Sequence, residues 1–573
     1  MTTAVPSEFA TKPAKRMRIA VSSDARIAQL VGWFVAALLV IFIACPLVAI
    51  LAQAVMDADG HFDGFAQART ILSDPRLADS IVHSAFIAVA TTLVVIPMAF
   101  TFAFALCRTR IWGRGPLKLM ALAPMLAPSL MPAISLIYLF GNQGPLKAWL
   151  GSYSLYGPIG IVMGEAFYTF PHALLVILSA LALADARLYE AAETLGASRL
   201  RRLLTITLPQ AKYGLVSAAL LVFTLTITDF GVPKVVGGQY NVLALEAYKQ
   251  VIGQQHFGEG AVVGLMLLIP AVFAVFVERR LARGHAGALS GRSAVYIPKA
   301  NRTRDVLLWL ACMLITVFLL ALLGTAVAAS FIKLWPYSME FSLAHYDFDM
   351  VDGGGWLAFR NSIKLAGYTA LLSSGVLFLT TYLLEKTPLP VLASRIMRTV
   401  AMLPMAVPGL VLGLGYIFFF NHPRNPLHAL YGTLAILVAS TVAHYFSTGY
   451  MTLSTALRQL DGEIEAVSAT LRRPWWHSCL KITLPVCLPA ILDVGRFMFV
   501  SAMSTVSCAI FLYTPDTVLA GVAVLNMDDA GDTAAAAAMA TLIVATSLAA
   551  TLVLNALGWL LNRRAQRWRI SKT

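Results

Sequence analysis

Long apolar stretches separated by short polar segments dominate this sequence. A helix needs about 20 consecutive apolar residues to cross the hydrocarbon core of a bilayer, and twelve stretches of that kind occur. They cover residues 28–53, 80–106, 117–140, 155–183, 211–232, 258–280, 305–331, 359–384, 397–420, 428–453, 487–513 and 533–561. The pattern predicts an all-α integral membrane protein with about twelve transmembrane helices.

Closely spaced prolines interrupt the apolar pattern at Pro124 and Pro128 in 117–140, and again at Pro404 and Pro408 in 397–420. Proline is tolerated inside a membrane when neighbouring helices or water satisfy the carbonyls that it leaves free. The composition supports lipid as the main solvent, because 58% of the 573 residues are hydrophobic and only 13% are charged. Soluble domains carry about 25% charged residues.

The charged residues alternate in sign from one loop to the next, which predicts the orientation of the chain. Lys and Arg gather near residues 12–26, 108–118, 187–212, 279–304, 386–398, 458–481 and 563–572, and Asp gathers near 57–79, 347–352 and 516–532. The positive-inside rule places the basic segments and both termini in the cytoplasm. The net charge of +14 therefore reflects topology, and we expect no nucleic-acid partner.

The six cysteines lie in or beside apolar stretches, without a CxxC pair and without histidine at metal-ligand spacing. They are Cys45, Cys107, Cys312, Cys479, Cys487 and Cys508. This pattern is typical of small apolar side chains rather than of a disulfide framework or a metal centre. We expect neither a metal site nor a cofactor.

The two halves of the chain repeat each other. Asp185 begins a segment that ends in Ile206-Thr207-Leu208-Pro209, and Asp461 begins one that ends in Ile482-Thr483-Leu484-Pro485, 276 positions later. We therefore expect two homologous six-helix halves, at 28–283 and 305–561, joined by a cytoplasmic linker at 284–304. Residues 1–27 and 562–573 form cytoplasmic tails in this reading. Two related halves with a path between them suit alternating access.

The segment 185–209 predicts a rigid elbow on the cytoplasmic side. Asp185 is suited to cap a first helix, and Gly196 to end that helix with left-handed backbone angles. Ser198 is suited to cap a second helix, which Pro209 is expected to stop before the next span. A short turn would connect two spans equally well, so the elbow indicates a docking surface for a partner.

Glu190-Ala191-Ala192, Gly196-Ala197 and the sequence ending at Pro209 resemble the EAA loop of ABC importer permeases. The resemblance extends over essentially the whole chain. It implies a type I importer with two ATP-binding subunits, a periplasmic solute-binding protein, and Glu190 and Gly196 as coupling residues. It also implies that Ala191 and Ala192 pack into a cleft of the ATP-binding subunit. The chain has no GxxxxGK[ST] phosphate-binding sequence, so we expect ATP hydrolysis on a separate chain and no enzyme activity here.

The second loop, 461–485, departs from the family pattern. Ala466 stands where Glu190 stands in the first loop, and Arg472 replaces Gly196. Glu465 lies one position earlier and offers a carboxylate. Pro474 is suited to the first position of a new helix, and Pro485 repeats Pro209. We expect the second loop to dock as well, with different contacts to the ATP-binding subunit.

Ionisable residues inside apolar stretches are candidates for function, because each costs about 2.5–3.5 kcal/mol at the bilayer centre on insertion scales. They are Glu165, His172, Asp229, His444, Asp493 and Arg496. Asp493 and Arg496 are three apart on a helix and are predicted to pair. By the resemblance, the fifth span of each half lines the passage. The candidate pathway residues there are Thr224, Thr228 and Asp229 in the first half, and Ser501, Ser504 and Thr505 in the second.

The cargo is the least constrained property. The run from Asp229 to Lys234 and the run from Tyr248 to Gln255 resemble fused permeases for 2-aminoethylphosphonate, whereas fused ferric-iron permeases share the two-loop plan. Residue chemistry does not decide between them, and 2-aminoethylphosphonate is the first expectation. An ion-driven secondary transporter built from two halves would leave the cytoplasmic elbow unexplained. An intramembrane enzyme or scaffold would need catalytic pairs that the spacing does not offer.

Overall fold

The computed structural model describes residues 23–565, except 57–60, 63, 65, 183–185, 286–295, 297, 352 and 462. Asp185, most of the expected linker and most of both expected tails lie outside the described residues. The first half of the chain contains α1 (Ser23–Leu39), α2 (Cys45–Gln53), α3 (Ala66–Leu72), α4 (Pro75–Arg108), α5 (Arg114–Leu122), α6 (Met131–Phe140), α7 (Pro158–Ala182), α8 (Ala186–Thr194), α9 (Arg199–Arg202), α10 (Leu208–Thr228), α11 (Gly231–Val236), α12 (Leu243–Tyr248) and α13 (Phe257–His285).

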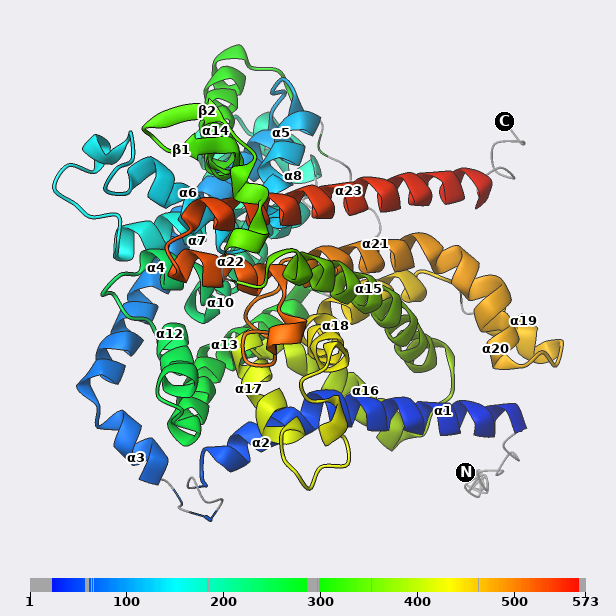
Figure 1. Cartoon of the computed structure of the whole chain (residues 1–573). Helices are drawn as coiled ribbons and strands as arrows, with labels where there is room; N and C mark the ends of the chain where they lie inside the picture. Colours follow the sequence, from blue (N-terminus) through cyan, green and yellow to red (C-terminus); the bar gives the residue numbers. More distant parts are fainter. Residues whose placement is uncertain are drawn as a thin grey trace, which may run out of the picture.

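The second half adds ten helices and one small hairpin within the described residues. They are α14 (Arg302–Phe331), β1 (Ile332–Leu334), β2 (Ser338–Phe341), α15 (Gly355–Lys386), α16 (Val391–Met402), α17 (Gly409–Phe420), α18 (Leu434–Arg458), α19 (Glu463–Thr470), α20 (Trp475–Ser478), α21 (Leu484–Met503), α22 (Ala520–Asp529) and α23 (Thr533–Ala565). Apart from the antiparallel β1–β2 pair, the described architecture is helical, which confirms the predicted all-α membrane class (Figure 1).

Nine helices of the described residues are long and apolar enough to cross a membrane. A tenth span arises if α5 and α6, which meet at a bend of 103° around Pro124 and Pro128, count as one. The other two predicted stretches correspond to α16 and α17, broken at residues 403–406, and to α18, whose serine, threonine and tyrosine residues make it less apolar. The prediction of about twelve spans therefore exceeds by two or three the number that length and composition support.

Two spans end earlier than the apolar pattern predicts. Helix α10 stops at Thr228 and α21 at Met503, although the apolar stretches run on to residues 232 and 513. At the first end, the Asp229 carboxylate accepts a hydrogen bond from the Val232 amide at 2.9 Å and so favours the start of α11. At the second end, residues 506–512 form buried turns, which are tolerated at membrane depth because protein covers them.

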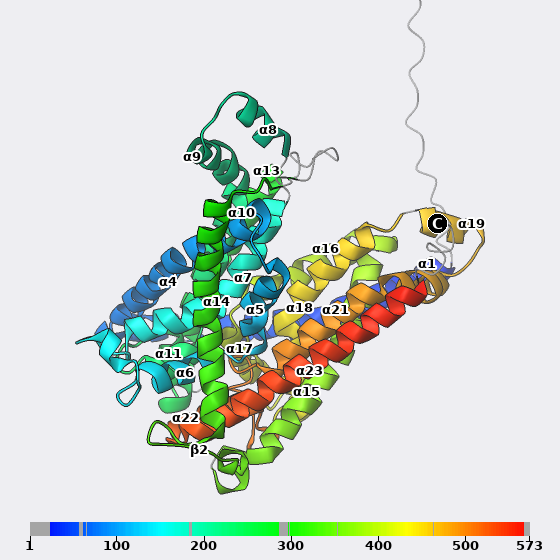
Figure 2. The ribbon, with the colours of Figure 1, turned by 90° about the horizontal axis from the view of Figure 1, so that it is seen from above.

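The first span of each half packs against the opposite half. Helices α1 and α2 lie along α16 and α17, while α14 lies along α4, α6 and α23 (Figures 1 and 2). The Tyr416 hydroxyl donates to the Phe42 carbonyl at 2.6 Å, and the rings of Phe42 and Phe420 stack at 5.7 Å. The two sequence halves are therefore interlocked rather than placed side by side.

Equivalent hydrogen bonds occur in the two halves, which supports the predicted repeat. The Ser84 hydroxyl of α4 accepts from the Leu243 amide at the start of α12, at 2.7 Å. The Ser362 hydroxyl of α15 accepts from the Ala520 amide at the start of α22, also at 2.7 Å. Both serines are buried, so each satisfies a helix-terminal donor that water does not reach.

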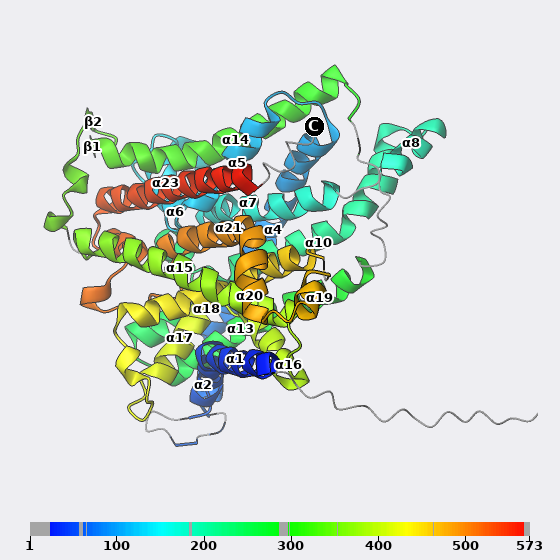
Figure 3. The ribbon, with the colours of Figure 1, turned by 90° about the vertical axis from the view of Figure 1, so that its right-hand side faces the viewer.

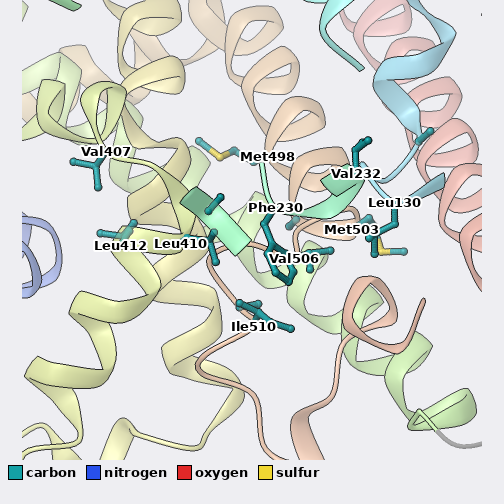
Figure 4. Packing of buried hydrophobic residues seen from close by; sticks show 14 of the residues in the cluster. Leu130, Phe230, Val232, Val407, Leu410, Leu412, Met498, Met503, Val506 and Ile510 are labelled. Atoms are coloured by element: carbon teal, nitrogen blue, oxygen red, sulfur yellow. The ribbon is translucent and has the colours of Figure 1, made fainter. Parts of the chain in front are cut away.

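The two halves meet in a continuous apolar core. Leu130, Phe230 and Val232 of the first half belong to the same buried cluster as Leu410, Val506 and Ile510 of the second (Figure 4). Close packing of this kind joins the two halves at the centre of the molecule.

Candidate functional site

The first loop forms the elbow that the sequence predicts. Helix α8 ends at Thr194. Gly196 in the turn that follows has a left-handed φ of +70°, and the Ala197 amide donates to the Ala192 carbonyl at 2.9 Å. This is the hydrogen bond expected where glycine terminates a helix. The Ser198 hydroxyl then accepts from the Arg201 amide at 3.3 Å, so Ser198 caps α9 as predicted.

The outer face of this loop is exposed. Glu190 and Ala191 are exposed, while Ala192 is half-buried. Leu195 is 86% exposed and Leu188 is 52% exposed. Because large apolar side chains on a water-facing loop lose free energy by remaining uncovered, this surface is typical of a docking site.

Pro209 does not stop the second helix, contrary to the prediction. The chain is helical from Arg199 to Thr228, with a π-helical turn at residues 203–207 and Pro209 in the first turn of α10. Proline lacks the N–H that a regular helix needs. The wider π-helical turn shifts the hydrogen-bond register just before Pro209, so the helix continues through it. Pro485 follows an equivalent π-helical turn at residues 479–483.

The second loop repeats this geometry with different residues. Helix α19 ends at Thr470. Arg472 in the turn that follows has a left-handed φ of +53°, and the Arg473 amide donates to the Ser468 carbonyl at 3.0 Å. Ala466 is exposed. Pro474 occupies the N-cap of α20 rather than its first position. The chain thus keeps the turn although it lacks the glycine.

Glu465 makes an intramolecular ion pair. Its carboxylate lies 3.4 Å from the Lys386 ammonium, which also donates to the Leu460 carbonyl at 3.0 Å. The side chain of Lys386 is only 7% exposed. The Glu465 carboxylate, which could replace the glutamate missing at position 466, is therefore paired with Lys386 of the same half. Glu190, in contrast, is exposed.

The two loops lie at the same end of the helix bundle. Figure 3 shows α8 and α19 at one end and β1–β2 at the other. Asp185 lies outside the described residues, so its expected capping role stays a prediction.

A second group of polar residues is buried between α7 and α10. The Glu165 carboxyl is fully buried beside the Asp229 carboxyl and the Thr226 hydroxyl, and neither of its oxygens has a hydrogen-bond partner. Tyr168, one turn along α7, lies close to both carboxyls and to Tyr445 of α18. This central polar cluster (Glu165, Tyr168, Thr226, Asp229 and Tyr445) thus contains residues of both halves.

The structure brings some predicted pathway residues into this cluster and leaves others out. Asp229 belongs to it, and Thr505 lies beside the Tyr445 hydroxyl. Thr228 and Ser504 instead bond to carbonyls of their own helices, at 2.8 and 3.1 Å. Ser501 is half-buried, and the Thr224 hydroxyl is buried without a hydrogen-bond partner.

The remaining ionisable residues of the spans have structural partners or apolar surroundings. Asp493 and Arg496 pair at 3.3 Å, as predicted. His172 lies 3.2 Å from the Tyr168 carbonyl oxygen, and the buried His444 ring packs on Tyr445.

Sequence reasoning missed Tyr168, Tyr445 and Lys386. Tyr168 stands one turn after Glu165 and was detectable from that spacing, whereas the other two owe their positions to tertiary packing. Among the described residues, no three His, Cys, Asp or Glu side chains are grouped so as to hold a metal ion.

Residues 95–285 and 388–567 each match a family described as "Binding-protein-dependent transport system inner membrane component". The two matches together cover more than half of the chain. The chain belongs to this family. It is a fused two-half permease of the ABC importer type, as the loop resemblance implied, and its relatives are permease components of transporters.

Several relatives carry ferric transport in their names, and these match most of this chain. The chain is 28% identical over 496 residues to "Putative ferric transport system permease protein FbpB 1" of Haemophilus influenzae, covering 84% of this permease and 77% of the relative. It is 27% identical over 528 residues to "Ferric transport system permease protein FbpB" of Actinobacillus pleuropneumoniae, covering 89% and 75%.

A shorter relative carries the phosphonate name. The chain is 25% identical over 256 residues to "Putative 2-aminoethylphosphonate transport system permease protein PhnV" of Salmonella paratyphi A, covering 44% of this permease and 93% of the relative. The first expectation for the cargo, 2-aminoethylphosphonate, is therefore not confirmed. The relatives named for ferric transport match a larger share of this chain than the relative named for phosphonate transport.

Proposed function

We propose that this permease imports ferric iron across the bacterial inner membrane, receiving it from a periplasmic binding protein. Two ATP-binding subunits dock on the loops around Glu190 and Ala466, with both termini on the same side. The full-length relatives with ferric names support this cargo, which was the alternative at the level of sequence.

The observation that carries the cargo proposal is the buried carboxyl pair Glu165 and Asp229 of the first half, beside Tyr445 of the second half in the central polar cluster. When these carboxyls ionise, a cation beside them gains Coulomb energy in the low-dielectric interior, whereas a phosphonate anion is repelled. Carboxylate, phenol and hydroxyl oxygens, the groups of this cluster, also suit a hard cation. 2-Aminoethylphosphonate stays the second candidate, supported by the PhnV relative and by its own ammonium group.

The test compares a deletion strain complemented with variants. We expect uptake of labelled ferric iron to be restored by the native gene and reduced about tenfold by Glu165→Gln, the effect of losing one charged contact worth about 1.4 kcal/mol. Asp493→Asn is the matched control, because it removes a carboxylate of a spanning helix outside the cluster.

Growth on 2-aminoethylphosphonate as sole phosphorus source is the second readout. Loss of growth in the deletion strain with normal iron uptake would replace the ferric proposal by the phosphonate one. Native-level iron uptake by Glu165→Gln would contradict the role of the carboxyl pair while leaving the permease assignment intact.

A further inference from the structure

A cavity of about 270 Å³ lies where the first loop meets the end of α4 and the described linker residues. Its walls come from three separate segments: Arg108 of α4, Tyr189 and Arg202 of the first loop region, and Tyr296 and Lys299 of the linker. A ligand held here would contact the coupling loop and the connection between the halves at the same time.

The charged residues among the described lining of this cavity are mainly basic. The cations are Arg108, Arg199, Arg202, Lys299 and Arg304, and the carboxylate is Glu193. Glu193 lies 2.8 Å from Lys299 and 3.8 Å from Arg202, and Arg304 pairs with Asp305 at 2.8 Å. The carboxylates of Glu193 and Asp305 thus offset two of the five positive charges, and an excess of positive charge remains.

Arg108 places one of these cations at the base of the cavity. Its side chain belongs to a residue that is only 4% exposed, and its guanidinium lies 5.1 Å from the Tyr189 ring centroid and 4.8 Å from that of Tyr296. One terminal nitrogen donates to the Leu181 carbonyl at 2.7 Å. The Nε atom is buried without a hydrogen-bond partner. Since an unsatisfied buried donor on a charged group costs free energy, an acceptor in the cavity would stabilise it.

The second half neutralises the corresponding charge internally. Lys386 is the last residue of α15, as Arg108 is the last residue of α4. The Arg108 guanidinium donates to the Leu181 carbonyl near the end of α7, and the Lys386 ammonium donates to the Leu460 carbonyl just after α18. Lys386 also pairs with Glu465 of the second loop at 3.4 Å. In the first half the aromatic rings of Tyr189 and Tyr296 take the place of that carboxylate, so the charge stays available to an external anion.

We propose that this cavity binds a phosphate-bearing anion. Arginine presents planar N–H donors that match phosphate oxygens, and tyrosine rings on Arg108 hold the guanidinium in place. The bound anion joins Arg199 and Arg202 of the loop region to Lys299 of the linker, and so restrains the first coupling loop. The phosphate comes either from the headgroup of an anionic phospholipid at the membrane surface or from free phosphate.

The test uses the purified full chain in nanodiscs of phosphatidylcholine, with thermal unfolding followed by tryptophan fluorescence. Inorganic phosphate is titrated at constant ionic strength, and a parallel sample uses nanodiscs that contain phosphatidylglycerol. The test variant is Arg199→Gln with Arg202→Gln. The charge-matched control is Arg201→Gln with Lys212→Gln, because neither of these residues lines the cavity.

Binding to the folded state raises the unfolding temperature. We expect this rise in the native protein and the control, and an about tenfold weaker response in the test variant after loss of charged contacts. A rise with inorganic phosphate assigns the site to free phosphate, and a rise only with phosphatidylglycerol assigns it to a lipid headgroup. No rise in either sample, or equal responses of all three proteins, would overturn the proposal. Ferric uptake is not part of the readout, so the outcome is independent of the cargo.

Discussion

Gly196 and Arg472 occupy the same left-handed turn in the first and second cytoplasmic loops predicted from the sequence, 276 positions apart. Their φ angles are +70° and +53°, and in each loop the next amide donates to the carbonyl five residues before it. The geometry of the elbow is thus retained where the family's glycine is absent. Arg472 adopts a conformation that disfavours residues with a Cβ atom.

We expect Arg472→Gly to stabilise the protein by about 0.5–1 kcal/mol, the relief of left-handed strain less the entropy cost of glycine. Gly196→Ala should destabilise it by about 1–2 kcal/mol from backbone strain alone, because a Cβ there meets no atom within 4 Å. Denaturant unfolding of the purified protein measures both. Gly367→Ala is the control, since it also meets open space but lies in a regular helix. Equal effects at positions 196 and 367 would contradict the strain argument.

Glu190 and Glu465 should respond differently to removal of their carboxylates. Glu190→Ala should leave stability unchanged and abolish coupled uptake, because the side chain is exposed on the docking face. Glu465→Ala should lower stability by about 1–2 kcal/mol, because it leaves the buried Lys386 ammonium without its anion. Unfolding and uptake assays on both variants separate the two roles. Full uptake by Glu190→Ala would reject the coupling assignment.

Ser84 and Ser362 should contribute equally to stability, because each accepts from the first amide of a short buried helix. Replacing either by alanine leaves that donor unsatisfied and should cost about 1 kcal/mol. Ser179→Ala is the matched control, since that exposed hydroxyl bonds only within its own helix. Denaturant unfolding of the three variants tests this, and a cost at Ser179 as large as at Ser84 would argue against the capping role.

Asp528 should make stability depend on pH. It lies in the last turn of α22, which is too short to span the membrane. Burial together with the Asp529 carboxylate raises the pKa of Asp528 from 3.8 to about 6, against the opposing effect of Lys234. Tyr138 and Tyr156 also face it. The folded protein binds the extra proton, so stability falls as pH rises from about 4 to about 6.

The unfolding temperature should therefore be higher at pH 5 than at pH 7, by the equivalent of about 1.4 kcal/mol (one pKa unit) before solvent screening. Asp528→Asn should remove this difference. Asp516→Asn, which replaces an exposed aspartate, should retain it. An unchanged pH dependence in Asp528→Asn would show that another group is responsible.

Several features of the candidate site were predictable because they depend on neighbouring residues in the chain. The turn at Gly196 and the cap at Ser198 follow from local backbone and hydroxyl chemistry. The end of α10 was not predictable from hydrophobicity, since the residues after Asp229 remain apolar. The course of the chain through Pro209 was also missed, because a π-helical turn absorbs the missing donor.

The amino-acid sequence by itself determined the helical membrane class, the repeat of two halves and the position of both loops. In lipid every backbone group must be satisfied within its own segment, so apolar composition alone specifies helices. Only the tertiary structure decided that Glu165 lies beside Asp229, that Lys386 binds Glu465 and that the first spans exchange between halves. Those contacts join residues far apart in the chain, and they depend on how the helices pack rather than on any local pattern.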